Sequence, residues 1–272
     1  MSGVVGVEPF GGVVVSADGT RIAFDRYGSE GPAVILVHGA MTDRAHPTLR
    51  DVAAALAPWF TVVNYDRRGR GDSGDTRPYA VEREVEDLAA LVAEVGGAAM
   101  VFGGSSGAAL ALEAALRLPG ITRVAAWEPP YRVVADAPAL PDGFAAHLEA
   151  LVDGGRPGDA VEDFMVRGAG MPAEMVAGMR GQPFWEEAEV IARTLAYEAA
   201  VVGPGGVPSE RLATVGCPTL VLTGQNSPAW MVAAGKAVAA MIPGASYRTL
   251  DGQAHNVSPV ALAPELLEFF SG

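Results

Sequence analysis

Short apolar runs, rich in β-branched residues, alternate along the chain with longer Ala-rich stretches in which apolar positions recur every three or four residues. The short runs are typical of strands buried in a parallel sheet, and the longer stretches are typical of the helices that connect such strands. The predicted strands are residues 12–16, 21–26, 33–38, 61–65, 99–102, 123–127, 219–223 and 246–250. The predicted helices between and after them are residues 48–57, 81–95, 107–117, 229–241 and 258–270.

This order of elements predicts an α/β fold in which a mostly parallel, eight-stranded sheet is covered by helices on both faces. The first two strands are an exception. Asp18 and Gly19 lie between them, and an Asp-Gly pair is a hairpin signal, so we expect an antiparallel edge at this side of the sheet.

One long region, from Glu128 to Cys217, contains no predicted strand. Its pattern indicates amphipathic helical segments near residues 142–152, 159–167, 173–179 and 185–202, separated by Gly- and Pro-rich breaks. We expect an insertion after the sixth strand that forms a cap over the edge of the sheet where ligands of open α/β sheets bind. The alternative is a helical layer that is packed for stability alone.

The expected domain organisation follows from this insertion. Residues 1–134 would form the N-terminal part of an α/β core, residues 135–205 the helical cap, and residues 206–272 the C-terminal part of the core. A chain of 272 residues is long enough for one large domain of this kind.

Composition narrows the candidate partners and the compartment. The net charge of −13 would repel phosphate backbones, which argues against nucleic acid. No apolar run approaches the roughly 20 residues of a membrane span, and residues 1–6 do not resemble a secretory signal. A single cysteine, Cys217, offers neither a disulfide nor a zinc site and is expected to be a small core residue. We therefore expect a cytoplasmic protein with a small-molecule substrate, no cofactor, no metal and no membrane partner, and homo-oligomerisation stays open.

The most informative local pattern lies between a predicted strand and a predicted helix. It matches the G-x-S-x-G nucleophile elbow and reads Gly103-Gly104-Ser105-Ser106-Gly107. Small residues there allow a tight, strained turn that projects the serine hydroxyl. Only Ser105 has glycine two positions away on both sides, so it is the candidate nucleophile, with Ser106 as the competing serine.

Two further motifs make the chain resemble the α/β-hydrolase family over nearly its whole length. Residues 34–40 resemble the family's strand followed by His-Gly-x, and residues 64–73 resemble its D-x-R-G-x-G-x-S turn. The resemblance implies an oxyanion hole formed by the backbone N–H groups of Ala40 and Ser106. It also implies a catalytic histidine after the last strand.

Four histidines are candidates for the general base, whose pKa has to lie near the working pH. His38 belongs to the His-Gly turn and is expected to order that loop, His46 follows it, and His147 lies in the predicted cap. His255 follows the last predicted strand, where the resemblance places the catalytic histidine. We therefore expect His255 to be the base.

The third member of a catalytic triad departs from the commonest family pattern, because residues 223–228 after the penultimate strand contain no carboxylate. Some α/β hydrolases, including certain haloalkane dehalogenases, take this acid from the end of the preceding strand, where Glu128 stands. We expect Glu128 to orient His255. Asp251 is a weaker substitute, because it is close to His255 in sequence and lies on the strand side.

These residues predict acyl transfer from an ester, lactone or thioester by way of an acyl-enzyme on Ser105. Two alternatives stay open: a lyase or cyclase of specialised metabolism that uses His255 as acid and base, and a binding protein with slow turnover. Eight apolar side chains of the predicted cap are candidates for an apolar pocket or, equally, for core contacts: Phe144, Phe164, Met165, Met171, Met175, Met179, Phe184 and Trp185.

Overall fold

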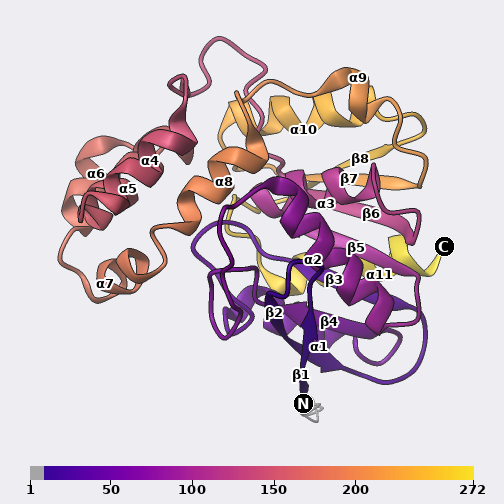
Figure 1. The fold of residues 1–272 in the computed structure, drawn as a ribbon. Helices are drawn as coiled ribbons and strands as arrows, with labels where there is room; N and C mark the ends of the chain where they lie inside the picture. Colours follow the sequence, from indigo (N-terminus) through magenta and orange to yellow (C-terminus); the bar gives the residue numbers. More distant parts are fainter. Residues whose placement is uncertain (1–8) are drawn as a thin grey trace, which may run out of the picture.

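The structure is a computed structural model in which residues 9–272 are described. Eight strands form one sheet in the order β1-β2-β4-β3-β5-β6-β7-β8. The strands are β1 Phe10–Val15, β2 Arg21–Tyr27, β3 Ala33–Val37, β4 Thr61–Tyr65, β5 Ala99–Gly104, β6 Ile121–Trp127, β7 Thr219–Gly224 and β8 Ser246–Leu250. The mostly parallel sheet predicted from the sequence is confirmed (Figure 1).

The antiparallel edge extends over two strand pairs. Strand β1 pairs with β2, and β2 pairs with β4, both in antiparallel orientation, whereas all pairs from β4 to β8 are parallel. The carboxyl ends of β3, β5, β6 and β7 therefore lie along one edge of the sheet. Ligand sites of open α/β sheets lie outside this edge.

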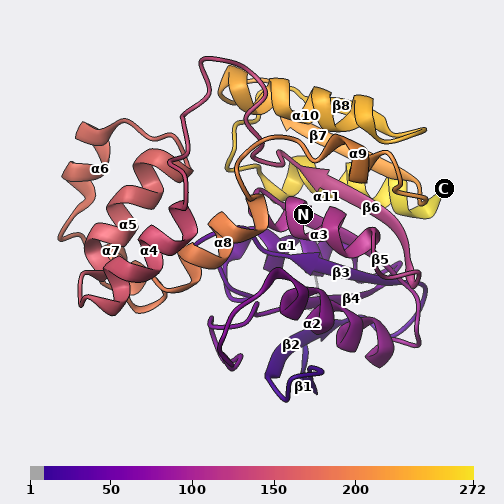
Figure 2. The ribbon, with the colours of Figure 1, turned by 45° about the horizontal axis from the view of Figure 1, so that its top comes forward.

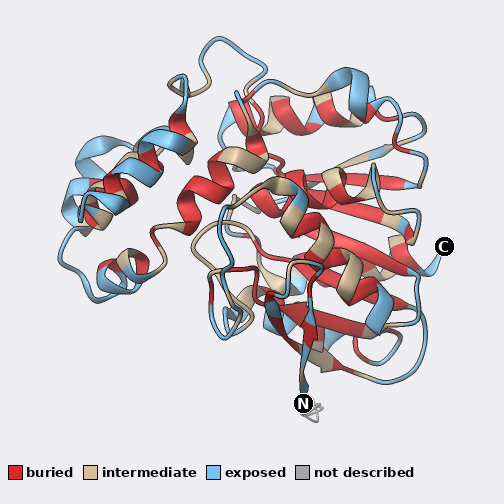
Figure 3. Cartoon of the chain, in the orientation of Figure 1, coloured by how far each residue is buried: buried red, intermediate tan, exposed pale blue. Residues whose placement is uncertain are grey.

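Helices cover both faces of the sheet, and the apolar central strands β3 and β5 are buried along almost their whole length (Figure 3). On one face α1 Pro47–Leu56 and α11 Pro259–Ser271 pack against side chains such as Leu36, Phe102 and Leu222. On the other face α2 Val81–Glu94, α3 Ser106–Ala115 and α10 Ala229–Met241 pack against side chains such as Val101 and Val221. A short helix, α9 Ser209–Leu212, precedes β7.

All the remaining helices fall between β6 and β7. They are α4 Phe144–Asp153, α5 Pro157–Asp163, the π-helical turn η1 Phe164–Gly168, α6 Ala173–Met179, α7 Pro183–Val190 and α8 Thr194–Val202. They enclose a hydrophobic cluster of their own, centred on buried side chains such as Leu148, Val161 and Leu195. Figures 1 and 2 show α4 to α7 to one side of the sheet, with α8 leading back to it.

Two predicted helices of this region are interrupted. The segment 159–167 is divided between α5 and η1, where the Ala169 N–H donates to the Phe164 carbonyl at 2.9 Å in a π-type turn. The segment 185–202 is divided between α7 and α8 by a turn in which the N–H groups of Thr194 and Leu195 donate to carbonyls three residues earlier, at 2.9 and 3.1 Å. Both breaks depend on local hydrogen bonds that the apolar period does not reveal.

Candidate active site

Ser105 occupies the turn between β5 and α3 in a backbone conformation that side chains rarely adopt. Its φ and ψ are 56° and −126°. Only two other non-glycine residues in the described chain have positive φ, Met41 and Glu128, and both belong to the same region of the molecule. Such strain is costly and is retained where the surrounding structure imposes it. The Ser105 N–H donates to the Trp127 carbonyl at 2.8 Å, which fixes the turn to β6.

The glycines around Ser105 allow backbone segments to approach closely. A Cβ atom at Gly103 would lie 2.2 Å from the Gly107 carbonyl oxygen, and one at Gly107 would lie 2.4 Å from the Val37 carbonyl oxygen. A Cβ atom at Gly39 would lie 3.1 Å from Cβ of Ser105. The loop after β3 is therefore packed directly against the turn that carries Ser105.

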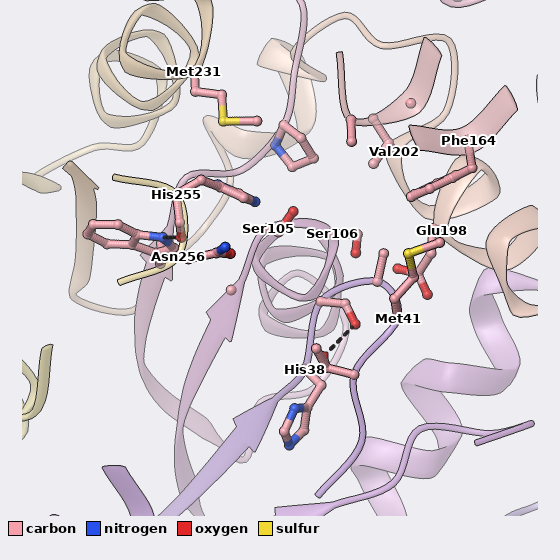
Figure 4. A pocket seen from close by; sticks show the side chains of 18 of the residues that line it. His38, Met41, Ser105, Ser106, Phe164, Glu198, Val202, Met231, His255 and Asn256 are labelled. Carbon is pink, nitrogen blue, oxygen red and sulfur yellow. Dashed lines mark hydrogen bonds between the residues drawn. The ribbon is translucent and has the colours of Figure 1, made fainter. Parts of the chain in front are cut away.

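His255 and Glu128, which are 127 residues apart, meet beside this turn. The Glu128 Oε2 atom lies 2.6 Å from Nδ1 of His255, and the Gly224 N–H donates to Oε1 at 2.7 Å. The Glu128 side chain is fully buried, whereas one third of the His255 side chain is exposed. Figure 4 shows the Ser105 hydroxyl and the ring of His255 pointing toward each other at the cavity. The structure thus brings the three predicted triad residues together.

The weaker candidate carboxylate is placed elsewhere. Among the described residues, Asp251 makes no recorded contact with the His255 ring, and its exposed side chain follows β8. The loop 225–228 supports the histidine loop through its backbone, because the Asn226 N–H donates to the Gln253 carbonyl at 2.8 Å. The Trp127 indole also donates to the His255 carbonyl at 3.0 Å.

The residues predicted to supply the oxyanion donors both reach the cavity at Ser105. Ala40 and Ser106 both line it, and Ser106 is the first residue of α3, where helical N–H groups have no partner within the helix. Within residues 9–272 neither N–H has a recorded acceptor.

His38, which directly precedes Gly39, is buried. Its Nε2 atom lies 2.6 Å from the side-chain oxygen of Asn64. Burial lowers the pKa of His38 to about 3, so the ring is neutral at pH 7.

A buried charge cluster lies behind the loop of residues 38–42, and the sequence analysis did not identify it. Arg67 contacts Glu84 at 2.7 Å and Glu198 at 2.8 Å, and Arg70 also contacts Glu198. Burial opposes ionisation of Glu84, but the Arg67 cation outweighs it and lowers the pKa of this carboxyl. The sequence does hint at a buried carboxylate, because Glu198 interrupts the otherwise apolar residues 195–202. Its arginine partners, however, are more than 120 residues away in the chain.

A cavity of about 270 Å³ lies over Ser105, between the sheet and the helices that follow β6. Its lining is predominantly apolar. Four of the eight predicted pocket residues line it: Phe144, Phe164, Met165 and Met171. Of the other four, Trp185 is buried among the helices, Met179 is half-buried against the same helices, and Met175 and Phe184 are exposed. The cavity also receives one carboxylate, that of Glu198, as Figure 4 shows.

Within residues 9–272 no three His, Cys, Asp or Glu side chains are grouped so that they could hold a metal ion. No helix in the same range has both the length and the apolar character needed to span a bilayer.

The sheet order, the strained serine and the buried carboxylate–histidine pair at the carboxyl edge define an arrangement typical of α/β hydrolases. The "Alpha/beta hydrolase family" model matches residues 34–267. The crystal structure of an alpha/beta hydrolase from Sphaerobacter thermophilus DSM 20745 is 52% identical, with a TM-score of 0.88, and the match covers 95% of this chain and 100% of that chain. The chain belongs to the alpha/beta hydrolase family.

Two curated relatives match over shorter segments. An uncharacterised hydrolase, YraK, from Bacillus subtilis is 40% identical over 105 residues, which is 37% of this chain and 38% of that protein. An N-formylmaleamate deformylase from Pseudomonas putida is 36% identical over 120 residues, or 43% of this chain and 44% of that protein. The chain therefore spans less than half the length of these relatives.

Proposed function

We propose that this protein is a serine hydrolase that cleaves a carboxylic ester, lactone or thioester of a small, apolar substrate. Ser105 would be the nucleophile, His255 the general base and Glu128 the acid that orients His255. The observation that carries the proposal is the 2.6 Å contact between the buried Glu128 carboxylate and Nδ1 of His255, beside a serine in a strained strand-to-helix turn.

The chemistry proceeds in two stages. His255 Nε2 takes the proton from the Ser105 hydroxyl as its oxygen attacks the substrate carbonyl, and Glu128 stabilises the imidazolium that forms. The N–H groups of Ala40 and Ser106 stabilise the oxyanion, and each donor is worth about 3 kcal/mol in the transition state. The imidazolium then protonates the leaving oxygen or sulfur. In the second stage His255 activates a water molecule, which releases the acid and regenerates Ser105.

We propose that residues 135–205 act as a cap that determines substrate selectivity. This segment supplies Phe144, Phe164 and Met165 to the cavity over Ser105. A cavity of about 270 Å³ with such a lining favours a short or medium apolar acyl or alcohol group. The domain boundaries at residues 134 and 205 belong to the same proposal.

Two other functions would use the same scaffold: a lyase or cyclase without an acyl-enzyme, and a binding protein with slow turnover. A fluorophosphonate probe separates them from a serine hydrolase, because only an activated serine is labelled rapidly. We expect rapid labelling at Ser105, and equally slow labelling of wild type and Ser105→Ala would favour the alternatives.

Turnover of p-nitrophenyl esters of increasing chain length tests the proposal directly. Ser105→Ala should abolish turnover while the fold is retained, because one oxygen atom is removed. Ser209→Ala, which changes an exposed serine at the start of α9, is the matched control and should retain activity. An N-formyl amide belongs in the substrate panel because one relative is named for deformylation. If the protein turned over that amide and none of the esters, the proposed substrate would be an amide instead of an ester.

A further inference from the structure

Two buried guanidinium groups donate hydrogen bonds to the carbonyl groups of the loop after β3. Arg67 Nη1 donates to the His38 carbonyl at 3.1 Å. Arg70 Nη1 donates to the Gly39 carbonyl and, at 3.0 Å, to the Thr42 carbonyl. Both arginine side chains are about 1% exposed. Their contacts with this loop are therefore fixed by the packed interior.

The Gly39 carbonyl accepts hydrogen bonds from Arg70 and, at 3.1 Å, from the Thr42 hydroxyl, and its direction fixes which way the next N–H points. The Gly39 carbonyl and the Ala40 N–H belong to one peptide unit, which is planar and trans, so the two groups point in opposite directions. Arg70 lies behind the loop and Ala40 lines the cavity. A carbonyl held toward Arg70 therefore directs the Ala40 N–H away from Arg70.

Glu198 holds Arg70 from a different part of the chain. Its carboxylate contacts Nη2 of Arg70 and, at 2.8 Å, Nη1 of Arg67. Glu198 belongs to α8, the last helix before the chain returns to the sheet, and its side chain is about 1% exposed. Burial and the neighbouring Arg67 cation lower the pKa of Arg70 to about 9, so this guanidinium is largely charged at pH 7.

We propose that Arg70 is a positioning residue for the oxyanion hole, and that Glu198 holds it from α8. Arg70 fixes the Gly39–Ala40 peptide so that the Ala40 N–H is ready for the oxyanion before substrate binds, and docking of α8 is coupled to this geometry. The inference rests on the proposed acyl transfer. It predicts that a change at this cluster weakens transition-state binding more than substrate binding.

The test uses the double variant Arg70→Met/Glu198→Gln, which removes one cation and one anion and leaves the Arg67–Glu84 pair intact. We expect kcat for a p-nitrophenyl ester to fall about 10- to 100-fold. Displacing an oxyanion donor should cost part of the rate that deleting the donor would cost. KM should change less than about threefold. The inhibition constant of an alkyl trifluoromethyl ketone, whose adduct carries an oxyanion, should rise by the same factor as kcat/KM falls.

A matched control removes another buried ion pair from the same turn. Arg68→Met/Asp87→Asn deletes a pair at 2.7 Å that has no recorded contact with residues 38–42 in the described chain. It should lower the melting temperature and leave kcat and the ketone inhibition constant within about twofold of wild type. If the first double variant does not fold, Arg70→Lys replaces it, since an ammonium group cannot bind two carbonyls and Glu198 in the same planar geometry.

The inference is overturned if the folded Arg70 variant keeps both kcat and the ketone inhibition constant within twofold of wild type, or if it matches the Arg68 control. Failure of the proposed function has a different signature. In that case wild-type protein itself shows neither ester turnover nor rapid fluorophosphonate labelling at Ser105.

Discussion

Replacement of Glu128 by glutamine should disturb His255 in a way that the hydrogen bonds of the Glu128 carboxylate define. The carboxylate accepts two hydrogen bonds, one on each oxygen, from the Gly224 N–H and from Nδ1 of His255. A glutamine has one oxygen and one NH₂ group, so it can accept only one of them. The side chain is 0% exposed, and water cannot replace the lost acceptor.

Both orientations of the glutamine impair the histidine. With its NH₂ group toward His255, the ring has to accept at Nδ1 and carry its proton on Nε2, which is the wrong tautomer for a base facing Ser105. With its NH₂ group toward Gly224, two donors meet in a buried site at a cost of about 1–3 kcal/mol. In either case the negative charge that stabilises the imidazolium is lost.

We expect Glu128→Gln to lower kcat by roughly 100- to 10,000-fold, which corresponds to about 3–5 kcal/mol in the activation free energy. Steady-state hydrolysis of a p-nitrophenyl ester measures the effect, and circular dichroism verifies that the variant is folded. Asp251→Asn is the control and should retain nearly full activity, since Asp251 has no recorded contact with His255 among the described residues. A Glu128→Gln enzyme within threefold of wild type, or an equal loss in Asp251→Asn, would refute the assignment.

Three other predictions concern stability and selectivity. Burial lowers the pKa of His38 from 6.5 to about 3, so between these pH values the unfolded chain binds a proton that the native chain does not. The free energy of unfolding should therefore fall by up to roughly 5 kcal/mol as the pH falls through this window. Urea titrations at several pH values should show that the free energy of unfolding depends less on pH in His38→Gln than in wild type. Parallel pH profiles of the two proteins would contradict this. Phe164→Ala, at the cavity, should shift the preferred ester toward longer chains in a kcat/KM series, whereas Phe184→Ala, which is exposed, should not. Gly103→Ala should unfold at a clearly lower temperature, since its Cβ atom would lie 2.2 Å from the Gly107 carbonyl oxygen, and an unchanged melting temperature would argue against this packing.

The sequence was sufficient where the relevant signal is local. The central strands β3 and β5 are short apolar runs, and the serine turn is a five-residue motif. Glu128 could be singled out because residues 223–228 lack a carboxylate and a strand ends immediately before it. Such features depend on the chain's own period and on neighbouring residues.

The charge cluster and the cavity lining could not be predicted in the same way. Arg67 and Glu198 are 131 residues apart, and the apolar neighbours of Glu198 indicate that it is buried without indicating which cation it meets. The apolar period of the cap segment identifies buried side chains, but it does not distinguish Phe164, which faces the cavity, from Trp185, which packs among the helices. That distinction depends on how the helices dock and on the π-type turn at Phe164–Gly168.

The central claim is that an acyl group is transferred to Ser105, and detection of that intermediate tests it most directly. Wild-type protein mixed with excess p-nitrophenyl ester is quenched in acid within the first turnovers, digested and analysed by mass spectrometry. We predict an acyl adduct on the peptide that contains Ser105, formed together with a burst of p-nitrophenol and absent from Ser105→Ala. Ester turnover with no adduct, or with the adduct on another residue, would contradict the account.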